Sequence, residues 1–347
     1  MDTITHFAAG ACIGELVAGR KVGKKAMVVG GAAQLVPDID FIFGMWMSPA
    51  ANALAHRGFT HSIFFLILVT PILAWASRRW WGDKSFSFQY WTLFLGAEVL
   101  THLFLDAFNA YGTGWFEPFS HERISFNAIF VADPFFSLPL GIALAVLLFT
   151  SKSFRWREIV ATGALALSAL YLVYGLYNKW QVEKKSTEAF ARHGISPAKH
   201  FTTPTPFNNW LWYIVATDSS GSFVGYRSVF DRSTDIQFEF FPRNDSLLFS
   251  SGVPPQQEVE LLKRLSQGHY TIEANGDTLI FNDLRFGQML GWQNPRGGFV
   301  FHYYLRPAID NTLVLQRGRF KGWDYQATET FIRRIMGDKS TSGIVEP

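Results

Sequence analysis

The sequence predicts an α-helical polytopic membrane domain of five to six spans, followed by a small soluble α+β domain. Its 347 residues are 48% hydrophobic and only 17% charged, which is unusually apolar for a soluble protein. Several segments in the first half are long and apolar enough for a helix to cross a bilayer. From residue 180 onward the chain is polar and balanced, with 18 basic and 17 acidic residues. We therefore expect a membrane-embedded domain over residues 1–178 and a second domain over residues 179–347.

The first two apolar segments differ from simple membrane helices. Thr5–Gly19 is short and rich in Gly and Ala, so it predicts a short span, a re-entrant segment or a packed interfacial helix. Ala26–Met47 is long enough to cross the membrane, but Pro37 interrupts it. Because broken helices at membrane depth usually line cavities, we expect a cavity at this break.

Four further segments predict membrane helices. Ile159–Tyr177 has nineteen residues without a charge, which matches the length of a membrane helix. Tyr90–Asn109 is also long enough, although it carries three ionisable residues. Phe135–Thr150 follows an Asp-Pro pair in which Asp133 is a candidate helix N-cap. The fourth segment is Phe59–Ala76, which ends at basic residues.

The region after residue 179 predicts short strands and helices. Asp218–Gly221 and Asn275–Asp277 are turn signals, and each separates two apolar runs, as in β-hairpins. The remaining periodic stretches look helical, and none of this region contains a recognisable catalytic motif. The expected strands are Trp210–Thr217, Ser222–Val229, His269–Ala274 and Thr278–Phe281, and the expected helices are Glu258–Leu265 and Tyr325–Ile335.

Basic residues of the first half are concentrated in three short loops. Of thirteen Lys and Arg in residues 1–179, ten lie in these loops, which alternate along the chain so as to share one face. The positive-inside rule makes that face cytoplasmic. The loops at residues 56–61 and 111–125, and everything after Tyr177, then lie outside. The ten residues are Arg20, Lys21, Lys24, Lys25, Arg78, Arg79, Lys84, Lys152, Arg155 and Arg157.

Ionisable side chains are set within or beside these apolar segments. A charged group near the bilayer centre costs about 2.5–3.5 kcal/mol on insertion scales, so such groups persist where they pair or bind something. Glu98, His102 and Asp106 are spaced at successive helical turns, so one helix face presents all three. A metal here must use His and carboxylate, because the single Cys12 excludes a Cys-rich zinc motif. The candidate ligands are His6, Asp38, Asp40, His56, His61, His102 and Asp106, enough for one ion or two.

Two further residues are candidates for catalysis. Glu98 can act as a general base, or as the acceptor that orients a metal-bound His102. Arg57 carries a guanidinium that can clamp an anion in bidentate fashion, or it can anchor its loop at the lipid headgroups. His121 is a weaker candidate, because a lone His is more often a hydrogen-bonded packing residue.

Five short motifs occur in a fixed order over residues 1–178. They resemble the YdjM/YbcI family of bacterial inner-membrane proteins, which are described as membrane-bound metal-dependent hydrolases. A later stretch, Asp283–Gly287, is similar to part of the trailing domain of longer members. The resemblance implies an inner-membrane location and a metal-dependent hydrolase. The motifs are Thr5-His6 with Gly10, Pro37-Asp38 with Asp40, His56-Arg57-Gly58 with Thr60-His61-Ser62, Thr101-His102 with Asp106, and Tyr111-Gly112-Thr113.

Together these observations predict a metal-dependent hydrolase whose site opens at the outer face of the cytoplasmic membrane. The expected substrate is a phosphoester or other ester of a lipid or lipid-linked molecule, and the expected ion is Zn²⁺ or Mn²⁺. The alternative is a non-catalytic membrane protein that binds or conducts a metal ion or proton. A third hypothesis is a scaffold that displays the C-terminal domain outside the cell. Nucleic acid is excluded as a partner, because the net charge is only +3 and no basic run is interleaved with aromatic residues.

Overall fold

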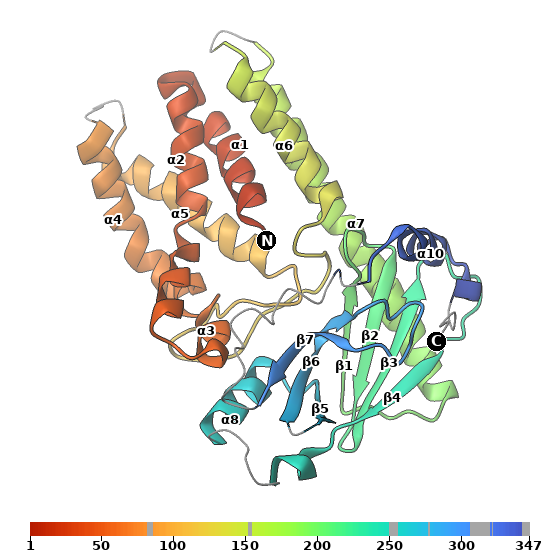
Figure 1. The fold of residues 1–347 in the computed structure, drawn as a ribbon. Coiled ribbons are helices and arrows are strands. Elements are labelled where there is room, and N and C mark those ends of the chain that lie inside the picture. Colours follow the sequence, from red (N-terminus) through yellow and green to blue (C-terminus); the bar gives the residue numbers. More distant parts are fainter. Residues whose placement is uncertain are drawn as a thin grey trace. The chain divides into compact units, whose positions relative to one another are not determined.

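The computed structural model describes residues 1–81, 86–151, 155–249, 256–276, 278–305, 320 and 322–341. The chain forms two compact units, and their elements are labelled in Figure 1. The first unit is helical, and the second contains the sheets. The first comprises Met1–Trp46, Ala55–Leu176 and Pro206–Asn208, and the second comprises Met47–Leu54, Tyr177–Thr205 and Asn209–Pro347.

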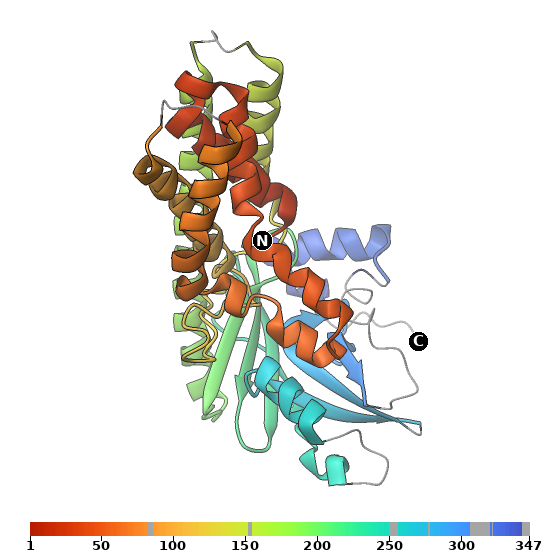
Figure 2. The ribbon, with the colours of Figure 1, turned by 90° about the vertical axis from the view of Figure 1, so that its left-hand side faces the viewer.

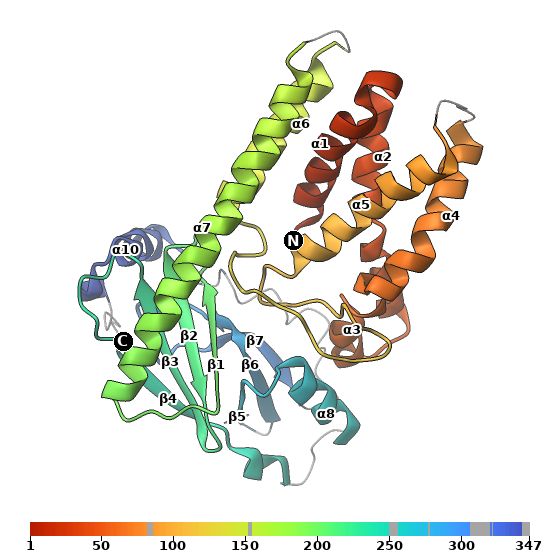
Figure 3. The same ribbon diagram turned by 180° about the vertical axis from the view of Figure 1, so that it is seen from behind.

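The helical unit begins with a tightly packed pair of helices, α1 (Thr3–Val22) and α2 (Lys24–Gln34). Gly23 joins them with a φ of 65°, a left-handed value that favours glycine. A Cβ on Gly10 would lie 2.5 Å from the carbonyl oxygen of Gly30, and a Cβ on Gly30 would lie 2.2 Å from that of Gly10. Both glycines are therefore required for the close approach of the two helices that Figures 1 and 3 show.

The chain breaks after α2 at the position of the predicted proline. Pro37 begins the 3₁₀ helix η1 (Pro37–Met45), and the axes of α2 and η1 are bent by 50°. A second bend, of 60°, precedes α4. The elements between these bends are α3 (Pro49–Ala55) and η2 (Phe59–His61), followed by α4 (Ile63–Trp81).

The remaining helices of this unit are α5 (Phe88–Asp106), α6 (Pro134–Phe149) and the 36-residue α7 (Arg157–Arg192), whose last part belongs to the second unit. Asp133 caps α6 by accepting a hydrogen bond from the Phe135 amide, as the sequence predicts. A buried apolar cluster joins α1, α2, α5, α6 and α7. It includes Ala8, Cys12, Met27, Leu105, Phe136, Leu140, Leu147 and Ala164.

The basic segments meet at one end of the helical unit, the upper end in Figure 1. Arg20 forms an ion pair with Glu158 at the start of α7, and the Lys24 ammonium donates to the Leu148 carbonyl. The Lys21 ammonium lies 4.7 Å from the centre of the Phe86 ring, beside the loop before α5. The predicted loops therefore share one end, although Lys84 and Lys152 lie outside the described residues.

The expected five to six membrane spans are not supported by length and composition. Among the described residues, α7 alone is long and apolar enough to cross a membrane, and the count rises to three if each bent pair is one span. α1 and α5 have 20 and 19 residues, but both contain ionisable side chains that lower their hydropathy, including Glu15 in α1 and Glu98 and Asp106 in α5. α6 is apolar, but it has only 16 residues.

Two antiparallel sheets and their helices make up the second unit, shown from two further directions in Figures 2 and 3. The strand orders are β1-β2-β3-β4 and β5-β6-β7. Both predicted hairpins form, and Asp277 of the second turn lies outside the described residues. The strands are β1 (Lys199–Pro204), β2 (Leu211–Thr217), β3 (Gly221–Ser228), β4 (Phe238–Pro242), β5 (Tyr270–Asn275), β6 (Thr278–Gln288) and β7 (Phe299–Tyr304).

Helices cover these sheets with apolar side chains. Val182 and Phe190 of α7 pack with Trp212 and Ile214 of β2 in a buried cluster. The helices α8 (Gln256–Leu265) and α10 (Tyr325–Ile335) form where the sequence predicts them, and short 3₁₀ turns occur at η3 (Asp245–Phe249) and η4 (Lys339–Thr341). The unit is thus the small α+β fold that its hairpin and helix signals indicate.

Candidate metal centre

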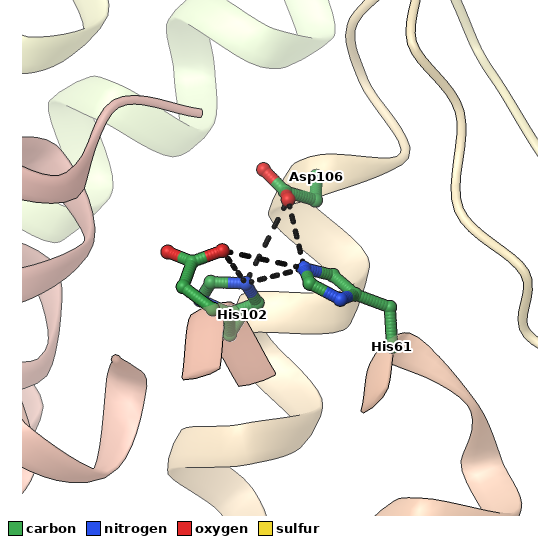
Figure 4. A group of neighbouring side chains, drawn as sticks. His61, His102 and Asp106 are labelled. Carbon is green, nitrogen blue, oxygen red and sulfur yellow. Dashed lines mark hydrogen bonds and ion pairs between the residues drawn. The ribbon is translucent and has the colours of Figure 1, made fainter. Parts of the chain in front are cut away.

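Four of the expected ligands come together where the broken helix meets α5. Asp38 comes from η1, His61 from η2, and His102 and Asp106 from the last turns of α5. One ligand atom from each lies within 4.8 Å of the other three. His61, His102 and Asp106 are fully buried, whereas the Asp38 side chain is 25% exposed. Figure 4 shows His61, His102 and Asp106 converging on one point.

The distances among these four atoms suit a tetrahedral ion. The Nε2 atoms of His61 and His102 are 3.1 Å apart, and Oδ1 of Asp38 lies 3.5 and 3.6 Å from them. Oδ2 of Asp106 lies 3.4 and 3.6 Å from the same two nitrogens. Metal bonds of about 2.0–2.1 Å to N and O give tetrahedral edges of roughly 3.3–3.4 Å. Among the described residues the buried Oδ2 of Asp106 has an ion pair with Arg57 but no hydrogen bond. The four donor atoms, by their chemistry and spacing, fit a divalent cation.

Asp40 lies behind His61 and not within this group of four. Its Oδ2 accepts hydrogen bonds from the Arg57 amide at 2.9 Å and the Thr60 hydroxyl at 3.1 Å, and it lies 3.5 Å from Nδ1 of His61. Its Oδ1 is 2.9 Å from Nδ1 of His56. A carboxylate in this place orients the imidazole whose other nitrogen faces the metal position. His56 is itself 43% exposed and lies on the far side of Asp40.

His6 lies beside the group of four, against Asp106. Its Nε2 is 3.1 Å from Oδ1 of Asp106, and its ring stacks on that of His102 with centroids 3.8 Å apart. The amino group of Met1 also contacts Oδ1 of Asp106. Glu98 is not one of the four, and its Oε2 accepts a hydrogen bond from Gln34 at 3.1 Å. Glu98 therefore contacts Gln34, and Nδ1 of His102 is buried without a hydrogen bond to any described residue.

Arg57 is buried against the group and not exposed at its edge. Its Nε lies 3.0 Å from Oδ2 of Asp106, and its Nη1 donates to Oδ1 of Asn109 at 2.7 Å. Its guanidinium carbon also lies 5.0 Å from the centre of the Tyr111 ring. The residue has a φ of 60°, in the left-handed region, and only 4% of it is exposed. The guanidinium therefore balances the negative charge of a buried carboxylate.

Two loops that the sequence predicts on the same side of the membrane hold this part of the site. Nη1 of Arg123 donates to the carbonyls of His56 at 3.0 Å and Arg57 at 3.1 Å. The Gly114 amide also donates to the Arg57 carbonyl, at 2.9 Å. The loop after α5 therefore fixes the segment from which His61 approaches the group. His121 lies apart from it and pairs with Glu117 at 2.8 Å.

Comparison with known families identifies the group to which the chain is related. Residues 1–182 match the model of the YdjM inner membrane protein family. The chain belongs to this family. Every residue of the candidate centre lies within the matched part, and membership places the protein in a membrane. No solved structure matches the chain.

Two curated relatives support the YdjM assignment. The chain is 32% identical over 122 residues to inner membrane protein YbcI of Escherichia coli K12, an overlap covering 35% of this chain and 69% of YbcI. It is 29% identical over 185 residues to the uncharacterized protein YfhP of Bacillus subtilis 168. That overlap covers 51% of this chain and 53% of YfhP, so the match spans about half of YfhP.

Sequence reasoning missed two residues of this YdjM-family site. Gln34 is the last residue of α2 and contacts both His6 and Glu98. Asn109 lies three residues after Asp106, and its Oδ1 accepts a hydrogen bond from the Arg57 guanidinium that pairs with Asp106. Each had a weak signal in the sequence. Gln34 is a lone polar residue in an apolar run, and Asn109 continues the polar face of α5 by one turn.

Proposed function

We propose that this YdjM-family protein is a membrane-bound metal-dependent hydrolase whose site faces the outer side of the cytoplasmic membrane. The proposal includes a multi-pass helical unit and an extracytoplasmic second unit. α1 and α5 support several crossings, because helices of 20 and 19 residues are about 30 Å long, the thickness of the hydrocarbon core. Their polar side chains face one another across the site, which removes much of the cost of placing them in lipid.

The convergence of four ligand atoms carries this proposal. Asp38, His61, His102 and Asp106 would hold one Zn²⁺ or Mn²⁺. An ion bound by such residues supplies a Lewis acid and an acidified water, which is the chemistry of metal-dependent hydrolysis. Asp38 is the only one of the four with a partly exposed side chain, so a substrate would approach from its side.

The surroundings of Asp38 favour a lipid or lipid-linked ester as the substrate. The same 3₁₀ helix exposes large apolar side chains, including Ile39 at 49% and Phe41 at 72%. Apolar side chains beside a polar centre suit a substrate with an acyl or isoprenoid chain and a polar ester group. We propose that Arg57 pairs with Asp106 and offers positive charge to a phosphoester that enters beside it.

Turnover in purified protein tests the proposal. The full chain in nanodiscs, loaded with Zn²⁺ or Mn²⁺, would be given 4-nitrophenyl phosphoesters and carboxylic esters, each with and without a long acyl chain. We expect metal-dependent release of 4-nitrophenol, faster with the acyl chain, that His102→Ala abolishes. His193→Ala, in the second unit, is the matched control because it alters an exposed His. No turnover of any ester by the metal-loaded protein would reject the hydrolase.

Conduction of an ion is the second candidate, and buried charge beyond the site favours it. Glu15 of α1 forms a buried bidentate ion pair with Arg157, at 2.7 and 2.8 Å, towards the basic end of the helices. Polar residues thus extend farther than a site restricted to the outer face requires. However, Nη1 of Arg157 also donates to the Leu147 carbonyl. The ion pair is therefore a fixed contact between helices. Zn²⁺ flux into dye-loaded proteoliposomes, lost in Glu15→Gln, would favour conduction over hydrolysis.

A further inference from the structure

A chain of buried hydrogen bonds leads from α5 through α2 to α1. Nε2 of Gln34 donates to Oε2 of Glu98 at 3.1 Å, and Oε1 of Gln34 lies 3.4 Å from Nδ1 of His6. All three side chains are fully buried. The chain ends at the candidate centre, where Nε2 of His6 is 3.1 Å from Oδ1 of Asp106.

The chemistry of these groups gives the chain a direction. Nε2 of Gln34 donates to Oε2 of Glu98, which turns the NH₂ group of Gln34 towards α5. The carbonyl oxygen of Gln34 then faces His6, and Nδ1 of His6 must carry a proton in order to donate to it. In a neutral imidazole with Nδ1 protonated, Nε2 holds a lone pair. That lone pair faces Oδ1 of Asp106, 3.1 Å away, so both atoms can accept from a cation placed beside them, and the Met1 amino group contacts this oxygen.

The helix packing is shaped around this chain. A Cβ on Gly10 would lie 2.5 Å from Cγ of Gln34, and a Cβ on Gly30 would lie 2.7 Å from Oε1 of Glu98. Side chains at these two positions would displace Gln34 and Glu98. The glycines that bring α1 and α2 together therefore also make room for Gln34 and Glu98.

We propose that Glu98 and Gln34 are positioning residues that hold His6 with its proton on Nδ1, so that Nε2 of His6 and Oδ1 of Asp106 together accept a second divalent cation. Asp106 would then bridge two ions, one at each carboxylate oxygen, as in two-metal hydrolytic sites. The cation would take the place of the Met1 amino group, which contacts the same oxygen. This inference rests on the proposed metal site, and it gives Glu98 a role through His6.

The tautomer of His6 is the first test, and it requires neither metal nor turnover. Metal-free full-length protein with ¹⁵N-labelled His would be measured by NMR, with the His6 signals assigned by their loss in His6→Gln. We expect a protonated Nδ1 and an unprotonated Nε2. Glu98→Gln keeps the shape but removes the fixed acceptor, so the preference of His6 for this tautomer should disappear. The charge-conserving double variant Gln34→Glu with Glu98→Gln should restore it, because the new carboxylate on α2 can accept both from the new amide on α5 and from His6.

Zn²⁺ stoichiometry is the second test. We expect two equivalents per parent chain, with the weaker one bound at least about tenfold more loosely in Glu98→Gln and regained in the double variant. Gln89→Leu, an exposed change on the same helix, should leave both equivalents unchanged. A parent His6 protonated on Nε2 would overturn the positioning role, and a single equivalent in the parent would overturn the second cation. Neither result would reject hydrolysis at the group of four, whose failure would appear as absent turnover.

Discussion

Asp106 has different neighbours at its two carboxylate oxygens. Oδ2 faces His61, His102 and Arg57, whereas Oδ1 faces His6. A buried ion without a partner destabilises a fold by several kcal/mol, so each charge here depends on the others. Loss of this one carboxylate would remove a metal ligand and leave the Arg57 guanidinium without its ionic partner.

Asp106→Asn and Asp40→Asn should therefore affect metal binding in different ways. We expect Asp106→Asn to abolish Zn²⁺ binding at the group of four, because a ligand oxygen and its charge are lost. Asp40→Asn should keep this ion but bind it about 10–100-fold more weakly, since Asp40 orients His61 from behind. Titration against a competing chelator measures both. Equal losses in the two variants would contradict the separate roles, and Glu260→Gln, an exposed change in the second unit, is the control.

His269 of the second unit should make its stability depend on pH. Burial, together with the nearby Arg285 and Lys199, lowers the pKa of this imidazole from 6.5 to about 3. Between these values the unfolded chain binds a proton that the folded chain does not, so the free energy of unfolding rises with pH. The slope is at most about 1.4 kcal/mol per pH unit.

Hydrogen exchange of β2 and β5 amides in the full chain, from pH 3 to 7, measures this dependence. His269→Gln should reduce the slope of unfolding free energy against pH by up to the contribution of one proton, because the titrating group is gone. Gln257→Ala changes an exposed side chain of α8 that does not titrate and should leave the slope unchanged. An identical slope in parent and His269→Gln would show that other groups cause the pH dependence.

At the scale of elements, the approach of α1 and α2 sets the positions of His6 and Gln34. Gly14 makes one of the tightest contacts along this crossing, because its Cβ would lie 2.2 Å from the Ala26 carbonyl oxygen. Backbone atoms cannot move aside as the end of a side chain can. The two helices would have to separate if this glycine were enlarged.

Gly14→Ala should lower the midpoint of thermal unfolding of the detergent-solubilised protein and weaken metal binding at the same time. Overpacking of this kind typically costs about 1–3 kcal/mol. Gly163→Ala is the matched control, because apart from its own helix backbone and chain neighbours no described residue lies within 4 Å of the Cβ that it would add to α7. A Gly14→Ala protein as stable as Gly163→Ala would mean that α1 and α2 adjust without strain.

The sequence predicted most elements because their signals are local. Pro37 marked the break after α2, and the turns marked both hairpins. α3 has only seven residues, too few to show a helical period, and it was missed. The strands β1, β4 and β7 were also missed, because their pairing depends on partners that are distant or weakly patterned in the sequence.

The sequence predicted which residues form the candidate site better than it predicted how they are arranged. Helical spacing placed His102 and Asp106 on one face of α5, and the structure agrees. Asp38 and Asp40 looked equivalent in the sequence. They lie in a 3₁₀ helix, however, where residues two apart point about 120° from each other, so only Asp38 reaches the group. The contact of Gln34 with His6 and Glu98 depends on the packing of three helices, which no local pattern specifies.

At the scale of the whole molecule, the proposed topology puts the basic ends of the helices in the cytoplasm and the second unit outside. Two single-cysteine variants, Lys25→Cys and Gly194→Cys in a Cys12→Ala background, test which side of the membrane each position faces. Both positions are exposed, so both cysteines can react. In intact spheroplasts a membrane-impermeant maleimide should label Gly194→Cys and not Lys25→Cys. After permeabilisation both should react, which is the control. Labelling of Lys25→Cys in intact spheroplasts would show that the orientation is opposite to the proposed one.

The ionisable residues of α5 have a consequence for biogenesis. This helix carries Glu98, His102 and Asp106, and each ionised residue raises the free energy of entering the bilayer by up to about 3 kcal/mol. Their described side-chain partners, His6, Gln34, Asp38, Arg57 and His61, all precede α5 in the chain. The ribosome has therefore already made these partners when α5 reaches the insertion machinery, and α5 can enter the membrane against them. Moving the codons of α5 ahead of those for α1 would expose its ionisable side chains to lipid alone. We expect this helix then to fail to insert and to remain outside the bilayer.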